Sequence, residues 1–192
     1  MERNIIVIGA SVGGVSALQT LVAGLPQSLK ASLFIVIHIP ASWPSVLPQI
    51  LSRAGPLPVL LAVEGMVIEQ GNIYVAPSNH HLMMQEGCLH VETGAKEHHV
   101  RPAANVLFRS AAHNFGSRVV GVVLTGSGQD GADGLLTIKQ YGGVAVVQDP
   151  HDASFPSMPL SAIAAFAPTL VDYVIPLSNI APLLIRLVSP SV

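Results

Sequence analysis

Charged residues are scarce in this chain. Only 10% of its 192 residues are Asp, Glu, Lys or Arg, whereas 50% are hydrophobic. A sheet with one solvated face needs many polar residues, so this balance favours a sheet that helices cover on both faces. The formal net charge of −2 at pH 7 gives no electrostatic reason to expect a nucleic-acid partner.

Cysteine is almost absent, because Cys88 is the only one. A single cysteine cannot form an internal disulfide, which fits a reducing cytoplasm. Mean hydropathy is high at +0.56, yet no uninterrupted apolar run approaches the roughly 18 residues of a membrane-spanning helix. The first residues, 1–4, make a poor signal peptide. We therefore expect a cytoplasmic protein without membrane insertion.

Nucleotide-binding patterns are missing as well. The dinucleotide fingerprint G-x-G-x-x-G requires a glycine where this chain has Ser11. It also requires an acid roughly 20 residues further along, but no acid lies between Glu2 and Glu64. The Walker A pattern is absent too, so the sequence disfavours a nucleotide site and no cofactor is expected.

The most informative stretch is Asn4–Gly14. Its residues Ile5–Ile8 are too few and too β-branched for a helix, so they predict a strand buried on both faces. Glycines then allow a sharp turn into a helix. The expected apolar stripe of that helix consists of Val15, Leu18, Leu21 and Leu25. The turn places Ser11 near free N–H groups at the positive end of the helix, which suits a phosphate or an oxyanion beside a nucleophilic hydroxyl.

Apolar runs and helical patterns alternate along the rest of the chain, as in proteins built from strand–helix–strand units. Further strands are predicted at Leu33–Ile37, Val59–Val63, Val119–Leu124, Val144–Val147 and Val171–Ile175. Helices are predicted at Ser42–Arg53, at Asn105–Phe115 and at Leu160–Ala165. One more helix follows the segment Thr125–Gly134 and ends at Gln140, and a final helix begins at Ser178. The alternating segments Asn72–Ala76, His81–Met84 and Leu89–Glu92, with a turn at Glu86–Gly87, predict a small antiparallel excursion.

The chain shows neither internal repeats nor a long linker. We predict one domain over residues 1–192, of the three-layer α/β/α class. Its sheet is expected to be doubly wound and mostly parallel, with a small antiparallel hairpin excursion.

Three predicted strands end in chemically apt residues, which are Ser11, His38 and, in a glycine-rich loop, Asp130. Ligand sites of open parallel sheets lie at the carboxyl ends of strands. If these strands are near neighbours, the three residues form a nucleophilic triad. Ser11 is then the nucleophile, His38 the general base and Asp130 the group that orients the imidazole.

Each of these residues also has a structural interpretation. Ser11 alone is an ordinary helix N-cap, and a lone histidine at a strand end is more often structural than catalytic. Asp130 is an ordinary turn residue, and Asp133 competes with it for the same role. The three together favour catalysis.

Several longer motifs accompany the three residues. They are Ile8-Gly-Ala-Ser-Val-Gly-Gly14, His38-Ile-Pro40, Tyr74-Val-Ala-Pro77 with His81, Arg101-Pro102 before Val106–Phe108, and Leu124-Thr-Gly-Ser-Gly-Gln-Asp-Gly-Ala132. Through these motifs almost the whole chain resembles the catalytic domain of the CheB-type protein-glutamate methylesterases of bacterial chemotaxis.

The resemblance implies that Ser11, His38 and Asp130 form the triad. It also implies a substrate, the methyl ester of a glutamate in the cytoplasmic helical bundle of a methyl-accepting chemoreceptor, and for some members deamidation of receptor glutamines. Family members usually carry an N-terminal receiver domain, and too few residues precede Ile5 to form one. We therefore expect a constitutively active enzyme, and a receiver domain that is either excised or a separate partner chain.

The chain departs from the family pattern at Val12, Ser127, Gln129 and Asn105. The backbone N–H groups of Val12 and Ser127 survive such changes and remain candidates for the oxyanion site, and Arg101 is a candidate substrate contact. Two other functions stay open: a small-molecule esterase or amidase with the same triad, and a non-catalytic interaction module.

The paired histidines His80–His81 and His98–His99 raise the question of a zinc site. No cysteine or carboxylate completes a ligand set at metal-site spacing. We therefore expect no metal.

Overall fold

The computed structural model describes residues 3–38, 46–165 and 171–189. A seven-stranded sheet forms its centre, in the order β3-β4-β2-β1-β7-β8-β9, and every pair of neighbouring strands is parallel. The strands are β1 (Ile5–Ala10), β2 (Ser32–Ile37), β3 (Val59–Leu61), β4 (Ile73–Val75), β7 (Val119–Val123), β8 (Val144–Gln148) and β9 (Tyr173–Ile175).

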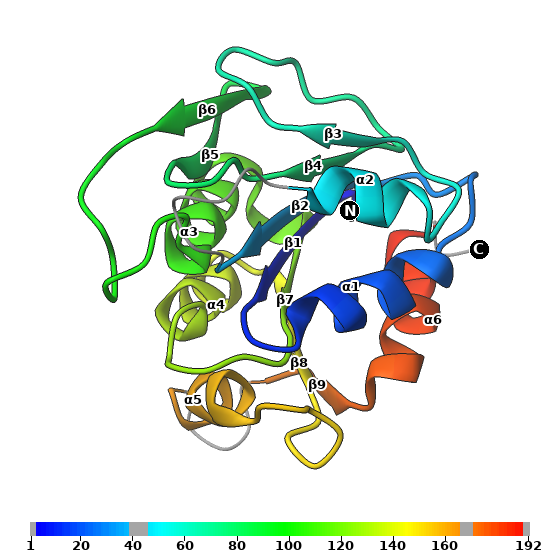
Figure 1. The fold of residues 1–192 in the computed structure, drawn as a ribbon, viewed down its shortest axis with the longest axis vertical. Helices are drawn as coiled ribbons and strands as arrows, with labels where there is room; N and C mark the ends of the chain where they lie inside the picture. The colour runs from blue at the N-terminus through cyan, green and yellow to red at the C-terminus, as the bar shows by residue number, and fades with distance from the viewer. Residues whose placement is uncertain (1–2, 39–45, 166–170, 190–192) are drawn as a thin grey trace.

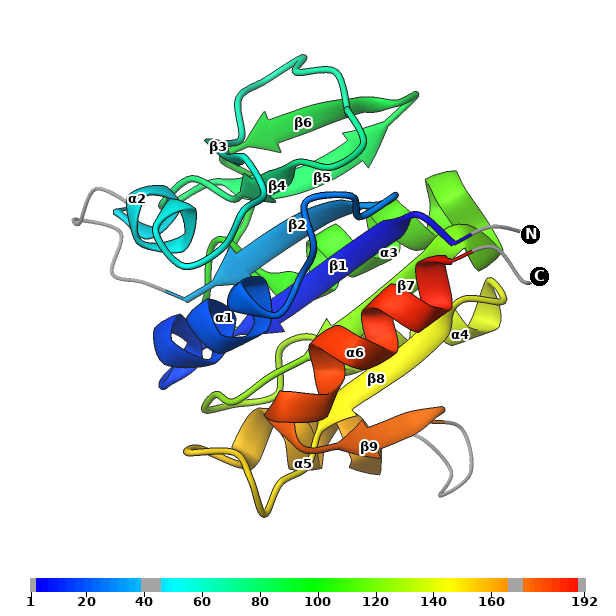
Figure 2. The ribbon, with the colours of Figure 1, turned by 90° about the vertical axis from the view of Figure 1, so that its right-hand side faces the viewer.

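Helices cover both faces of this sheet (Figure 1). One face carries α1 (Gly14–Ala23), α2 (Leu47–Ser52) and α6 (Leu177–Val188). The other carries α3 (Ala104–Phe115), α4 (Ala132–Gln140) and α5 (Ser157–Ala164), and a short 3-10 helix, η1 (Gly116–Arg118), follows α3. Figure 2 shows α1 and α6 crossing the sheet on the near face, with α3 and α4 behind it. The predicted three-layer arrangement is confirmed.

The side chains of the central strands alternate between the two layers. On β1, Ile6 and Ile8 pack with the α1 and α6 layer, whereas Ile5 and Val7 pack with the α3 and α4 layer. All six residues of β1 are buried. This two-sided burial explains why the strand consists of apolar residues without polar alternation.

The predicted antiparallel excursion is smaller than expected. Only β5 (His81–Gln85) and β6 (Cys88–Glu92) form it, and they pair antiparallel with each other. The prediction for Asn72–Ala76 was wrong, because β4 lies in the main sheet and pairs parallel with β2 and β3. The ring of Tyr74 stacks on Phe34 of β2, with 5.2 Å between ring centroids. Its hydroxyl meets backbone polar groups, among them the N–H of Glu69 at 2.8 Å, so the apparent alternation hides a fully buried strand.

Two helices also differ from the prediction. Val15 is 37% exposed and does not belong to the apolar stripe of α1. The buried positions of that helix are Gly14, Ala17, Leu18, Leu21 and Val22. Of the helix predicted at Ser42–Arg53, α2 supplies Leu47–Ser52, and the part at residues 39–45 lies outside the described residues.

Smaller differences concern element ends, as at α5, which begins at Ser157. Within the ranges that the structure describes, no helix combines the length and apolarity needed to cross a bilayer.

Helices α3 and α4 approach each other closely at Gly134. A Cβ atom on this glycine would lie 2.6 Å from Cβ of Phe108 and 2.9 Å from Cα of Asn105. Contacts this short are not tolerated, so only glycine fits between the two helices. The approach matters because α3 and α4 begin at the same edge of the sheet, near the ends of β1, β2 and β7.

We expect Gly134→Ala to destabilise the protein, although alanine is favoured over glycine within a helix by about 1 kcal/mol. Overpacking of a closed helix contact costs about 1–3 kcal/mol and forces α3 away from α4. Urea unfolding measures the effect, and Gln19→Ala at an exposed position of α1 is the control with little change. An unchanged or higher midpoint for Gly134→Ala would contradict the close approach.

Candidate active site

The three strand ends predicted to converge do lie side by side, because β1 stands between β2 and β7. At the end of the β1–β2 ladder, Ala10 pairs with Ile37, and the N–H of His38 donates to the Ala10 carbonyl at 3.2 Å. The N–H of Ser11 donates to the carbonyl of Thr125, beyond β7, at 3.0 Å. Ser11 and His38 therefore follow directly on paired positions of adjacent strands. The winding direction also changes at β1, as expected for a site of this fold class.

His38 and Asp130 are joined by a hydrogen bond. The distance from Nε2 of His38 to Oδ2 of Asp130 is 2.7 Å, and the side chains are 12% and 2% exposed. An ionised carboxylate can only accept, so Nε2 carries the proton of this bond. In the neutral ring Nδ1 is then the nitrogen with the free lone pair. Asp130 therefore sets the tautomer of His38.

The carboxylate of Asp130 also caps the N-terminus of α3. Its Oδ2 accepts the N–H of Ala104 at 2.5 Å, and its Oδ1 accepts the N–H of Asn105 at 3.0 Å. Burial acts to raise the pKa of Asp130, but the hydrogen bonds from His38, Asn105 and Ala104, with the charge of His38, hold that pKa below its usual value. The helix N-terminus contributes its own positive field. Asp130 is thus ionised at neutral pH.

Asn105, at the start of α3, in turn caps the N-terminus of α4. Its Oδ1 accepts the N–H groups of Gly131 and Gly134 at 2.9 and 2.8 Å. The N-cap residues of α3 and α4, Ala103 and Gly131, form no side-chain cap of their own. Each helix is therefore capped by a side chain that belongs to the start of the other. This reciprocal capping fixes Asp130 relative to the sheet edge.

The loop after β7 passes directly against Ser11. A Cβ atom on Gly126 would lie 2.7 Å from Cβ of Ser11 and 2.2 Å from the sulfur of Met158. Glycine at this position therefore permits the loop to approach the serine. The Ser11 hydroxyl donates to no side chain or carbonyl of the described residues.

Thr125 ties this loop to both of its neighbours. Its Oγ1 donates to the carbonyl of Val12 at 3.1 Å and accepts the N–H of Phe155 at 2.9 Å. Its N–H donates to Oε1 of Gln148 at 2.9 Å, and Nε2 of Gln148 donates to Asp152 at 2.8 Å. Sequence reasoning missed Gln148. The signal was present, because a buried glutamine ends the apolar run of β8 at this same sheet edge.

The two oxyanion candidates lie in this region. Val12 is 46% exposed, and Ser127 follows Gly126 in the loop beside Ser11. Neither N–H donates to an acceptor in the described ranges of the chain. Both amides are therefore free to meet a ligand there, and their role as oxyanion donors stays a prediction.

The Arg101 guanidinium has internal partners. It donates to Oδ1 of Asn79 from Nε at 3.1 Å and from Nη2 at 2.8 Å. Its Nη1 donates to the carbonyls of Thr93 and Gly94 at 3.0 and 2.5 Å. Four of its five N–H groups thus join the segment before α3 to Asn79, which precedes β5, and to the residues that follow β6. Substrate contact by Arg101 stays a prediction.

The other histidines have separate surroundings. His81 is 2% exposed and lies between the carbonyl of Ala95 and the N–H of Ala103, at 2.9 and 3.2 Å. His98 places Nδ1 3.1 Å from Nε2 of Gln129. Across the described part of the chain, no group of three or more His, Cys, Asp and Glu side chains is arranged to hold a metal ion.

Known proteins are similar to this chain over nearly its full length. The family model for CheB methylesterase matches residues 6–184. A protein of Leptospira interrogans is 40% identical over 188 residues, which cover 97% of this chain and 96% of that protein.

Other relatives are longer. Proteins of Methanosarcina mazei and Pyrococcus abyssi, both named protein-glutamate methylesterase/protein-glutamine glutaminase, are each 36% identical. Each comparison covers 97% of this chain but only 52% and 51% of those proteins. The chain spans about half the length of these two relatives.

The fold agrees with a solved structure. The crystal structure of the Thermotoga maritima CheB methylesterase catalytic domain superposes with a TM-score of 0.90 and 32% sequence identity, covering 97% of this chain and 100% of that one. The resemblance carried by the sequence motifs is thereby confirmed. By family model, sequence identity and structure alike, the chain belongs to the CheB methylesterase family.

Proposed function

We propose that this protein is a protein-glutamate methylesterase that hydrolyses glutamyl methyl esters of a chemoreceptor's cytoplasmic domain and also deamidates receptor glutamines. The relatives' names and the family support this activity. The observation that carries the proposal is the hydrogen bond between the buried Asp130 and the partly buried His38, at the strand end next to that of Ser11. With this substrate, the proposal includes a cytoplasmic location for the protein.

In the proposed first step, Oγ of Ser11 attacks the glutamyl carbonyl carbon, and its proton passes to Nδ1 of His38. The ionised Asp130 stabilises the imidazolium that forms. The tetrahedral oxyanion accepts hydrogen bonds from the free N–H groups of Val12 and Ser127. One such donor typically contributes roughly 3 kcal/mol to the lowering of the barrier.

The intermediate then expels methoxide, which takes the proton of His38 and leaves as methanol. A water molecule attacks the resulting acyl-serine and gives its proton to Nδ1 of His38. Collapse of the second intermediate passes the proton of His38 to Oγ of Ser11 and releases the glutamic acid side chain, which loses its own proton to solvent and becomes the carboxylate. The same reaction steps on a glutamine side chain release ammonia in place of methanol, so a single site serves both reactions.

We expect Ser11→Ala to lower the rate of methanol release from a methylated receptor fragment by a factor on the order of 10⁵–10⁶. This is the size of the loss in kcat when a triad nucleophile is removed. Ser16→Ala, at an exposed position of α1, is the matched control and keeps full activity. A fluorophosphonate should label the unmodified protein at Ser11 and the Ser11→Ala variant at no residue. Substantial activity in a well-folded Ser11→Ala variant would remove Ser11 as the nucleophile.

We expect Asp130→Asn to lower turnover by on the order of 10⁴. The amide of an asparagine can donate to Nε2 of His38, which moves the ring proton to Nδ1, where no proton can then be accepted. The Asp130→Asn protein must be shown to fold, because residue 130 also receives α3. Glu92→Gln, an exposed carboxylate-to-amide change, is the control. Near-normal turnover in Asp130→Asn would exclude this orienting role.

The pH profile tests the base. Because the pKa of Asp130 is lowered, this carboxyl stays ionised through the mildly acid range, where histidines titrate. Since a general base must be unprotonated to accept a proton, we expect activity to decrease from pH 8 to pH 5. Initial rates of methanol release measured from pH 5 to 8 on a protein of verified stability give the profile. A flat profile would argue against His38 as the base.

A further inference from the structure

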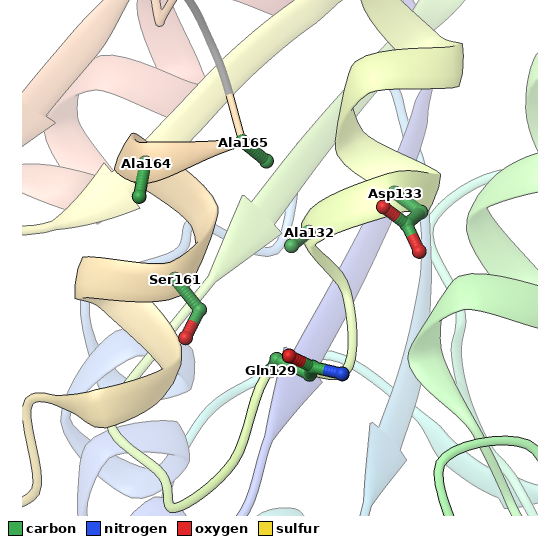
Figure 3. Close-up of a pocket in the computed structure, with 6 residues that line it drawn as sticks. All are labelled: Gln129, Ala132, Asp133, Ser161, Ala164 and Ala165. Atoms are coloured by element: carbon green, nitrogen blue, oxygen red, sulfur yellow. The ribbon is translucent and has the colours of Figure 1, made fainter.

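A pocket of about 320 Å³ opens beside the loop that carries Asp130. It is lined by Gln129, Ala132, Asp133, Ser161, Ala164 and Ala165. One wall is the start of α4 with the loop before it, and the opposite wall is the second half of α5 (Figure 3). Ser11, His38 and Asp130 do not line it, so it adjoins the candidate active site without being part of it.

Asp133 gives this pocket a negative charge, and its carboxylate accepts no hydrogen bond from the residues that the structure describes. Its side chain is 68% exposed, and one carboxylate oxygen lies 3.8 Å from Nε2 of His98, beyond hydrogen-bond distance. Arg109 acts on Asp133 through its charge, but the guanidinium donates to both carboxylate oxygens of Glu97. That ion pair balances Arg109. Asp133 lies in the first turn of α4, whose positive end offsets part of its charge, so the carboxylate of the lining is only partly compensated.

The other polar groups of the pocket present acceptors. Figure 3 shows the amide oxygen of Gln129 on the side of α5 and its nitrogen on the far side, where it lies 3.1 Å from Nδ1 of His98. The hydroxyl of Ser161 donates to the carbonyl of Gly128 at 3.2 Å, which leaves its lone pairs available. Ala164 ends α5, and the carboxyl end of a helix carries partial negative charge. The Asp133 carboxylate, the Gln129 amide oxygen and the carboxyl end of α5 therefore favour a cation, against the smaller opposing charge of the α4 N-terminus.

The volume of the pocket and the chemistry of its lining indicate which kind of ligand it can bind. The volume of about 320 Å³ lies at the lower end of the roughly 300–1,000 Å³ of small-molecule pockets, and it accommodates one side chain of a larger substrate. The methyl groups of Ala132, Ala164 and Ala165 offer an apolar surface to an aliphatic stem, while the acceptors surround its charged head. Lysine and arginine side chains combine these two features.

We propose that this pocket is a specificity subsite that binds a lysine or arginine side chain close to the target glutamate of the substrate protein. The inference rests on the proposed function, because it names what the same site recognises. On a helical substrate, residues three or four positions away lie on the same face as the target. The subsite would thus select among the methylated glutamates of a receptor by their cationic neighbours.

The experiment uses peptides with one glutamyl methyl ester and with lysine, norleucine or glutamate placed three or four positions before or after it. Methanol release gives kcat/KM for each peptide. We expect the best lysine peptide to exceed its norleucine counterpart by about threefold to fivefold, as for a partly exposed ion pair. Because salt screens such a pair, the ratio should fall towards one at high ionic strength.

Two variants test the location. Asp133→Asn should bring the lysine-to-norleucine ratio close to one, and Ala164→Leu, which fills the pocket, should lower the same ratio. Glu86→Gln, an exposed carboxylate in the β5–β6 turn, is the matched control and keeps the ratio of the unmodified protein.

Equal kcat/KM values for lysine and norleucine peptides, or an unchanged ratio in Asp133→Asn, would overturn the subsite and leave the methylesterase proposal standing. If none of the peptides were hydrolysed, both the subsite and the methylesterase proposal would be overturned.

Discussion

The carboxylate of Asp130 accepts hydrogen bonds from His38 and from the first two N–H groups of α3, while Asn105 of α3 accepts two N–H groups of α4. Neither helix supplies its own side-chain cap. A buried carboxylate that loses such partners is left uncompensated, at a cost of several kcal/mol. The ionised state of Asp130, the tautomer of His38 and the mutual placement of α3 and α4 are therefore one coupled set of interactions, and a change in any member is felt by the others.

Small residues make this coupling geometrically feasible. The capping exchange requires the N-termini of α3 and α4 to lie together, and Gly134 allows it because even a methyl group would collide with Phe108 and Asn105. On the other side of the site, Gly126 lets the loop after β7 reach Ser11. In both places the backbone, and not a large side chain, fills the space next to the functional groups. Polar groups of the backbone thus stay close to the candidate reaction centre, where they serve as caps and as free donors.

The sheet and most helices could be predicted from the sequence, because two-sided burial leaves long apolar runs such as Ile5–Ile8 and Val119–Leu124. The parallel pairing of β4 in the main sheet could not be predicted, since a tyrosine with a satisfied hydroxyl imitates the alternation of a half-solvated strand. Convergence of Ser11, His38 and Asp130 at one edge followed from the rule for parallel sheets. The capping by Asn105 had no sequence signal, because its partners Gly131 and Gly134 belong to another helix.

Asp130 and Asp133 show why residue type alone does not assign a role. They stand three positions apart at the start of one helix, yet Asp130 is 2% exposed and hydrogen-bonded to His38, whereas the Asp133 side chain is 68% exposed and faces a pocket. A buried, fully partnered carboxylate holds another group in place but is not accessible to a ligand. An exposed carboxylate without a close partner attracts a cation but orients nothing. The turn into α4 separates these two environments, so two carboxylates three positions apart have different surroundings at the same sheet edge.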